Sequence, residues 1–376
     1  ATVDKVRLNL NCRDEMIPIL RGLQYIYSIP LLRNEILTLV AGDVNRETRE
    51  DCGREGLNYW QILVLASVRM GCNLNYDKLQ DLAEQHRTLR HIMGIGDWDE
   101  KTHLRWRRSR DTDCLVKPAT IEKISQLVVE AGHELVPEAI YSVRADSFVV
   151  QTNIHYPTES TLILDGTRKV IELCADLADA FDLPGWRQQA HLLKKTRQIV
   201  RIIGRQAHSR SRKHKGNVKQ SYQILLGRAK KVLDRADELI ETLETECEMD
   251  MASIGTLADL QGFMARTRQV CDTAYRRVVL REEVPNSEKL FSIFEPHTQL
   301  YKRGKASEPV QFGRLVLIYE DSAGFVVHHH LMSREAQDQD VAVEQTRILQ
   351  TRVGGKITDL SFDCGFHSPE NQKGLQ

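Results

Sequence analysis

The feature that most constrains the fold is a change in hydrophobic period near residue 139. Before this point apolar residues recur at helical spacing, as at Trp60, Leu63 and Val64. From residue 140 to residue 150 apolar and polar residues alternate, and β-branched residues are frequent. Helical segments followed by a half-buried strand predict a mixed fold of helices and strands, in the α+β or α/β class.

A pair of helices with a short turn is expected within the first 139 residues. Residues 57–70 and 76–86 both have helical periodicity, and the Gly- and Asn-containing segment at 71–75 separates them. This arrangement is compatible with a DNA-reading helix-turn-helix. Two helices of a plain scaffold give the same pattern, so both interpretations stay open. Another amphipathic helix is expected over residues 119–135.

Strand and helix signals follow one another in a defined order after residue 150. We expect a short strand at 153–157, a long helical block at 169–281, strands at 289–294, 313–319 and 324–330, a helix at 341–353, a strand at 356–363 and a helix beginning at Ser368. A strand with an Asp, a hairpin, a helix and a strand ending in a second Asp is the order of an RNase H-like fold. The long helical block would be an insertion into that fold.

The predicted domain organisation follows from these elements. We expect a helical N-terminal domain over 1–139, the first part of an RNase H-like domain over 140–168, a basic and acidic helical insertion over 169–284, and the remainder of the RNase H-like domain over 285–376.

Charge is strongly segregated although the net charge is zero. The stretch at 183–233 contains many Lys and Arg residues and no acid, whereas 234–250 is rich in Asp and Glu. Segregation of this kind predicts a local contact with a polyanion. The candidate DNA-binding residues are Lys194, Lys195, Arg197, Arg201, Arg205, Arg210, Arg212, Lys213 and Lys215. The alternative is a solvated helix face that the acidic helix balances.

Several classes of protein are disfavoured by composition. No apolar run of about 18 residues exists, so no transmembrane helix is expected. The N-terminus has no signal-peptide pattern, and it lacks an initiator Met, so we expect a processed chain or a fragment. The 8 cysteines form no CxxC pair. Scattered cysteines of this kind predict reduced thiols in a cytoplasmic protein.

Two aspartates on strand signals are the candidate catalytic residues. Asp146 lies within the alternating segment, and Asp363 ends the last predicted strand. Phosphoryl transfer on DNA uses divalent ions that carboxylates hold, and Mg²⁺ prefers hard oxygen ligands. An Asp near a strand end is common, so either residue taken alone is more simply a structural one.

Four segments resemble bacterial insertion-sequence transposases of the DDE class. RADSFVVQTNIHYPTESTLILDG at 144–166 resembles the first-Asp motif of that family, and LSFDCGFHSPENQ at 360–372 resembles the second. GREGLNYWQILVLA at 53–66, with YSIP before it and NYDKL after it, is similar to the InsH-type N-terminal domain. FSIFEPHT at 291–298 resembles the central strand region. The nearest group is the ISNCY-type transposases.

The resemblance implies a function and a set of site residues. Asp146 and Asp363 would be the first and second ligands of catalytic Mg²⁺ or Mn²⁺. The family's third acid, a Glu on a downstream helix, has no counterpart, because Glu370 follows Asp363 too closely. The resemblance therefore implies that the RNase H-like domain over 285–376 is incomplete and truncated at its C-terminal end. It also implies that the InsH-like domain over 1–139 binds DNA ends. Cys364 stands where the family pattern has Arg. The implied partners are DNA, both the terminal repeats of the element and the target, and a homo-oligomer on paired ends, with no membrane and with a cytoplasmic, nucleoid-associated location.

Three functions remain open at this stage. The first is a DDE transposase that cleaves DNA and transfers strands, in a truncated copy. The second is a non-catalytic DNA-binding remnant that binds element ends, which the missing third acid suggests. The third is a metal-dependent nuclease on the same fold, which would give cleavage products without strand transfer.

Overall fold

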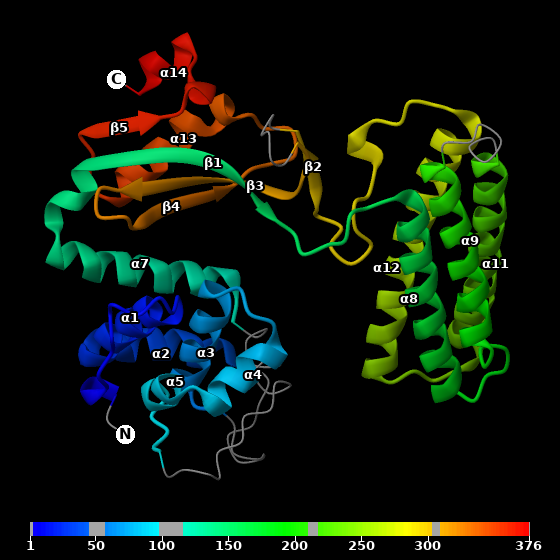
Figure 1. The fold of residues 1–376 in the computed structure, drawn as a ribbon, viewed down its shortest axis with the longest axis horizontal. Helices are drawn as coiled ribbons and strands as arrows, with labels where there is room; N and C mark the ends of the chain where they lie inside the picture. The colour runs from blue at the N-terminus through cyan, green and yellow to red at the C-terminus, as the bar shows by residue number, and fades with distance from the viewer. Residues whose placement is uncertain (1–2, 45–56, 98–115, 210–216, 303–308, 376) are drawn as a thin grey trace. The chain divides into compact units, whose positions relative to one another are not determined.

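The structure is a computed structural model that describes residues 3–44, 57–97, 116–209, 217–302 and 309–375 (Figure 1). The chain forms two compact units. The first unit comprises residues 1–145, 318–329 and 342–376, and the second comprises residues 146–317 and 330–341. Strands β1 and β3, defined below, each continue from one unit into the other. Within the described ranges no helix has the length and apolarity that a membrane span requires.

The N-terminal part of the first unit is helical and surrounds one apolar core. Its elements are η1 (Val3–Lys5), α1 (Met16–Ser28), α2 (Pro30–Val44), α3 (Tyr59–Gly71), α4 (Tyr76–Gln85), α5 (Arg87–Ile92), α7 (Pro118–Leu135) and η2 (Pro137–Tyr141). Leu20, Ile36 and Val64 are fully buried in the core. The helical prediction for this part of the chain is confirmed where the structure describes it.

Side-chain caps define the two helices of the expected helix-turn-helix. Asn58 and Gln61 form a reciprocal capping box at the start of α3, and Asn75 accepts a hydrogen bond from the Lys78 N–H at the start of α4. Asn73 adopts a positive φ of 49° in the turn between them. α4 ends at Gln85, and the His86 ring then caps α5.

One mixed sheet follows. Its strands are β1 (Ser142–Gln151), β2 (Gln299–Tyr301), β3 (Gln311–Asp321), β4 (Val326–Leu331) and β5 (Asp359–Phe362), in the order β2-β3-β1-β5, with β4 also paired to β3 (Figure 1). β2 runs antiparallel to β3, and β5 runs parallel to β1. β3 and β4 are joined by a tight turn in which the Asp321 N–H donates to the Phe325 carbonyl. The fold is therefore of mixed α and β type.

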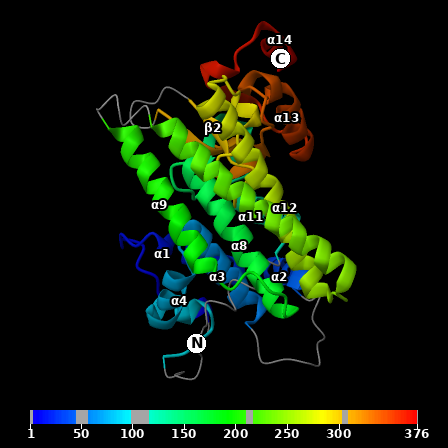
Figure 2. The same cartoon turned by 90° about the vertical axis from the view of Figure 1, so that its right-hand side faces the viewer.

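The second unit contains a bundle of long helices, which follow β1 and precede β2 along the chain. They are α8 (Glu159–Ala180), α9 (Gln189–His208), α11 (Val218–Glu246) and α12 (Met251–Ala274), and α12 continues into the π-helix η3 (Tyr275–Leu280). The four long helices run side by side in both views (Figures 1 and 2). Buried residues recur at helical spacing along α8, for example Ile163, Val170 and Cys174.

The remaining elements are η4 (Asn286–Glu288), α13 (Asp338–Arg352), η5 (Cys364–Phe366) and α14 (Pro369–Gly374). Gly354 and Gly355 end α13 with positive φ angles of 66° and 75°, which glycine tolerates without strain. Ser368 caps α14, as its position before Pro369 predicts.

Two predicted strands are wrong. Residues 153–157 form an irregular segment that leads into the Thr158 cap of α8. Residues 289–294 form an irregular segment with bends, in which the Ser292 hydroxyl accepts hydrogen bonds from the backbone N–H groups of Phe294 and Glu295. Ile293 is fully buried against the helical bundle. Its apolar neighbourhood therefore reflects contact with helices and not with a sheet.

Candidate functional site

Asp146 lies on an exposed face of β1. Val143, Ala145 and Ser147 are buried on the opposite face, so the alternation of the strand directs Asp146 to the accessible side. One carboxylate oxygen of Asp146 accepts a hydrogen bond of 2.7 Å from the backbone N–H of Ser147. This bond orients the carboxylate, and no second partner of its side chain is found among the described residues.

Asp363 follows the last residue of β5. Its backbone is extended, with φ −67° and ψ 157°, and its side chain caps the 3-10 helix η5. One carboxylate oxygen accepts a 2.5 Å hydrogen bond from the Cys364 N–H. Asp363 is exposed, so it resembles Asp146 in both accessibility and local hydrogen bonding.

The strand register relates the two aspartates. β1 and β5 are parallel, and their paired residues run from Ser142 with Asp359 to Ala145 with Phe362. Asp146 is the next residue of β1, and Asp363 directly follows β5. Each aspartate is therefore the first residue beyond the paired segment.

A cleft of about 520 Å³ lies beside Asp363. It is lined by Asp363, Cys364 and His367 together with residues of α14. Cys364 is exposed, and its thiol stands where an arginine was expected from the family pattern. Glu370 lies in the first turn of α14 and does not line the cleft.

The predicted cations of α9 form one exposed stripe. Lys194, Arg197, Arg201 and Arg205 are all exposed, and their spacing of three or four residues aligns them along one side of the helix. Lys195 is exposed on the adjacent side. None of these five cations has an ion pair within the described part of the chain. The other predicted cations, Arg210, Arg212, Lys213 and Lys215, lie outside the described residues.

Two acidic residues of α11 contact side chains of α12. Asp237 forms an ion pair with Arg268 of α12. Glu244 accepts a hydrogen bond from Gln261, which is also on α12. Among the described residues, no ion pair joins an acid of α11 to a cation of α9. No contact among the described residues therefore supports the alternative, in which the acidic helix neutralises the basic face of α9.

A histidine and a carboxylate meet where β1 leads into the bundle. The His155 Nε2 lies 3.3 Å from a carboxylate oxygen of Asp165, which is in the second turn of α8. Burial raises the pKa of Asp165, while His155 and Arg168 oppose the shift. The Asp-Gly pair at 165–166 would suggest a turn from sequence, but both residues lie inside α8.

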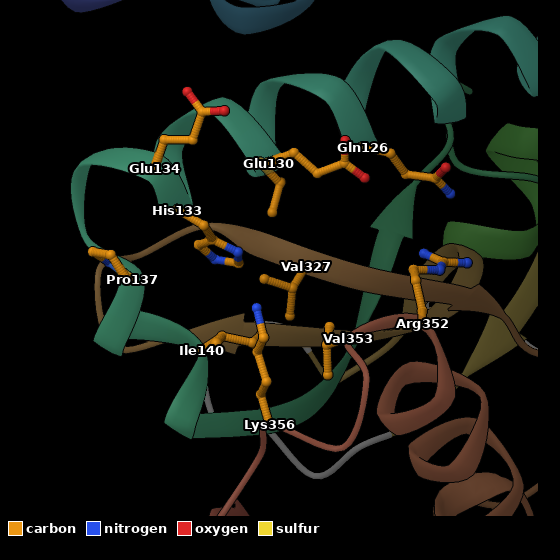
Figure 3. A pocket seen from close by; sticks show the side chains of 11 residues that line it. Gln126, Glu130, His133, Glu134, Pro137, Ile140, Val327, Arg352, Val353 and Lys356 are labelled. Atoms are coloured by element: carbon orange, nitrogen blue, oxygen red, sulfur yellow. The ribbon is translucent and has the colours of Figure 1, made fainter.

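A pocket of about 370 Å³ lies in the first unit between α7, β4 and the end of α13 (Figure 3). The side chains of His133, Val327 and Lys356 surround it (Figure 3). The His133 ring contacts the buried Asp321 carboxylate at 2.7 Å, and that carboxylate also accepts hydrogen bonds from the backbone N–H groups of Ala323 and Phe325. His133 therefore holds α7 against the β3–β4 turn.

No residue predicted as a site lines the pocket of Figure 3, and its lining mixes acids and cations. Among the residues that the structure describes, no group of three or more His, Cys, Asp or Glu side chains is positioned to hold a metal ion. Comparison of the chain with family models, with curated proteins and with solved structures finds no match.

Proposed function

We propose that this chain is a DNA transposase of the DDE class with an RNase H-like catalytic fold, in which Asp146 and Asp363 are two of the catalytic carboxylates. The observation that carries the proposal is the register of β1 against β5, because the first residue beyond the paired segment is an aspartate on each strand. The resemblance of residues 144–166 and 360–372 to the Asp motifs of insertion-sequence transposases points to the same pair.

The order of elements supports the RNase H-like assignment. A long strand, β1, pairs with β3, and β3 forms a hairpin with β4. The helix α13 then leads to β5, which runs parallel to β1 on its other side. This is the sequence of a strand, a hairpin, a crossover helix and a parallel strand that the fold requires. The bundle of α8, α9, α11 and α12 is an insertion between the first strand and the hairpin.

The two carboxylates fit a divalent cation such as Mg²⁺ or Mn²⁺. Proteins commonly bind Mg²⁺ through one or two carboxylates, and waters and substrate phosphates complete the coordination. A bound ion of this kind activates the attacking hydroxyl and stabilises charge on the phosphate oxygens. Asp146 and Asp363 each use one oxygen to accept a backbone N–H bond, so both side chains are already oriented.

The exposed cations of α9 support a DNA partner. Lysine and arginine side chains that neutralise phosphates give affinity that falls steeply with salt and that carries little sequence information. The stripe from Lys194 to Arg205 would therefore hold the DNA backbone and leave sequence recognition to other residues. The DNA partners are the terminal repeats of the element and the target, and the working form is a homo-oligomer on paired ends.

Metal binding tests the catalytic assignment directly. We expect Mn²⁺ to bind the purified chain in titrations followed by electron paramagnetic resonance, and we expect Asp146→Asn and Asp363→Asn each to weaken that binding at least tenfold. Asp359→Asn is the matched control, since Asp359 is an exposed aspartate at the opposite end of β5. Unchanged Mn²⁺ affinity in both site variants would refute the shared metal site.

A non-catalytic DNA-binding protein is the second candidate function. The exposed cations of α9, which form no ion pair with any described residue, favour it, because they need no catalytic site to bind phosphate. Incubation of a supercoiled plasmid with the chain and Mn²⁺ separates the two functions. Nicking that Asp146→Asn abolishes supports the transposase. Salt-dependent plasmid binding without nicking supports the DNA-binding protein.

A further inference from the structure

A cleft of about 730 Å³ opens within the second unit, where the N-terminus of α8, the C-terminal half of α9 and the start of β3 come together. Its walls are largely apolar and include Ile203, Leu290 and Phe312. The volume lies within the range of roughly 300–1,000 Å³ that is typical of pockets for small organic ligands. A single nucleotide can enter a space of this size, whereas a double helix cannot.

The rim of the cleft is cationic. Arg277, Lys289 and Lys302 line it, and Glu159 is the one acidic residue among the described residues of its lining. Glu159 is already neutralised by Arg277, which lies within hydrogen-bonding distance of its carboxylate. Lys302 is exposed and has no ion pair with any described residue. The cleft therefore combines an apolar interior with excess positive charge at its edge.

An aromatic ring is displayed at the same edge. Tyr156 lines the cleft, and 72% of its surface is exposed. The ring packs edge-to-face against Phe312, with the ring centroids 5.6 Å apart, so its orientation is fixed while much of it stays accessible. Accessible aromatic rings beside a cationic groove are the usual platform for unpaired bases, because every base has a face that can stack.

The basic stripe of α9 leads to this cleft. His208 follows Arg205 by three residues on the same side of α9, and it also lines the cleft. The segment of α9 from Lys194 to His208 extends about 21 Å along the helix at 1.5 Å per residue. A DNA backbone that follows these cations therefore arrives at the rim near Lys302 and Tyr156.

We propose that this cleft binds an unpaired nucleotide of the DNA substrate, whose base stacks on Tyr156 and whose phosphate contacts Lys302 and Lys289. The inference rests on the proposed function, since it takes DNA to be the partner of α9. Its ligand is single-stranded because a base in a duplex is stacked on its neighbours and offers no free face to a protein ring. The apolar walls receive the base, and the charged rim receives the phosphate.

Fluorescence anisotropy with two labelled DNAs tests the proposal. One is a blunt duplex of about 20 base pairs, and the other is the same duplex with an overhang of about four thymidines. We expect the overhang to tighten binding about five- to a hundredfold. Tyr156→Ala should remove this gain and Tyr156→Phe should retain it, because both aromatic rings can stack. Lys302→Ala should lower the salt dependence of overhang binding by about one counterion.

Tyr275→Ala is the matched control, because Tyr275 is an exposed tyrosine of the same unit that does not line the cleft. A second readout is ultraviolet cross-linking of an overhang that contains 5-iodouracil, and peptide mapping should locate the adduct at Tyr156. Equal affinity for the two DNAs, or an overhang gain that survives Tyr156→Ala, would overturn the proposal. Failure of both DNAs to bind at low salt would instead refute the DNA-binding function on which it rests.

Discussion

Substitution of Gly166 by alanine should destabilise the bundle, although alanine is the better helix former. Gly166 lies inside α8 where that helix meets α12. A Cβ atom at this position would overlap the Thr267 hydroxyl and would lie 3.1 Å from both the Cβ and Cγ2 atoms of Thr267. Thr267 is fully buried, and its hydroxyl donates a 2.7 Å hydrogen bond to the Phe263 carbonyl.

The magnitude follows from two opposing effects. Alanine in a helix interior is favoured over glycine by about 1 kcal/mol. Overpacking of a buried contact costs about 1–3 kcal/mol when the neighbour cannot move away. Thr267 is β-branched, and rotation about its Cα–Cβ bond would break its hydrogen bond. We therefore expect the free energy of unfolding to fall by up to about 2 kcal/mol, a net value that combines these two effects.

Gly227→Ala is the matched control with the opposite expected sign. Gly227 is an exposed residue inside α11, and a Cβ atom there would meet no atom within 4 Å. Thermal unfolding followed by circular dichroism should give a lower midpoint for Gly166→Ala and a higher midpoint for Gly227→Ala, by about 2–4 °C per kcal/mol. Thr267→Ala should restore part of the loss in the double variant. A midpoint that rises equally in both single variants would refute the packing argument.

Three further outcomes are expected from burial and close contact. Burial raises the pKa of the Cys271 thiol to about 12. Iodoacetamide at about pH 8 should therefore alkylate the exposed Cys12 and leave Cys271 unmodified, as peptide mass mapping would show. Equal labelling of the two cysteines would contradict this. Burial also raises the pKa of Asp165. A carboxyl group whose pKa is raised in the folded state destabilises the fold when the pH exceeds that pKa. Asp165→Asn should therefore raise the urea midpoint of unfolding at about pH 7, and the gain should fade toward about pH 4. Gly313→Ala should lower the thermal midpoint, because its Cβ would overlap the Val150 carbonyl across the sheet; an unchanged midpoint would show that the strands can separate there.

The sequence predicts a helix or strand correctly where neighbouring residues alone determine it. Alternation at 140–150 predicted β1, which spans Ser142–Gln151, and the Ser368-Pro369 pair predicted the cap of α14. The predicted strand at 289–294 failed because Ile293 is apolar for a different reason, which is burial against the bundle. A short apolar run does not reveal whether a sheet or a set of helices will cover it.

The two candidate sites differ in how much of each the sequence could predict. Asp146 and Asp363 were chosen from separate motifs, and only the register of β1 with β5 relates them in space. No sequence pattern predicts the cleft in the second unit. Tyr156 and Lys302 are more than a hundred residues apart, and they share no motif with each other or with Lys289. Isolated cations and one exposed tyrosine have no sequence pattern, so their convergence is a property of the fold alone.

The zero net charge of the chain conceals the basic helix α9 and the acidic C-terminal half of α11, and the contacts of these two segments decide what each charge does. Asp237 of α11 pairs with Arg268 of α12, whereas Arg201 and Arg205 of α9 pair with no acid in the described ranges. Exposed ion pairs contribute only about 0–1 kcal/mol, so the bundle loses little stability when α9 leaves its cations unpaired. Arg201→Ala and Arg205→Ala should therefore weaken DNA binding and lower its salt slope by about one each, with little change in the thermal midpoint. Lys123→Ala, at an exposed lysine of α7, is the control; if the α9 variants lowered the midpoint as much as the affinity, their cations would be stabilising the bundle and not contacting DNA.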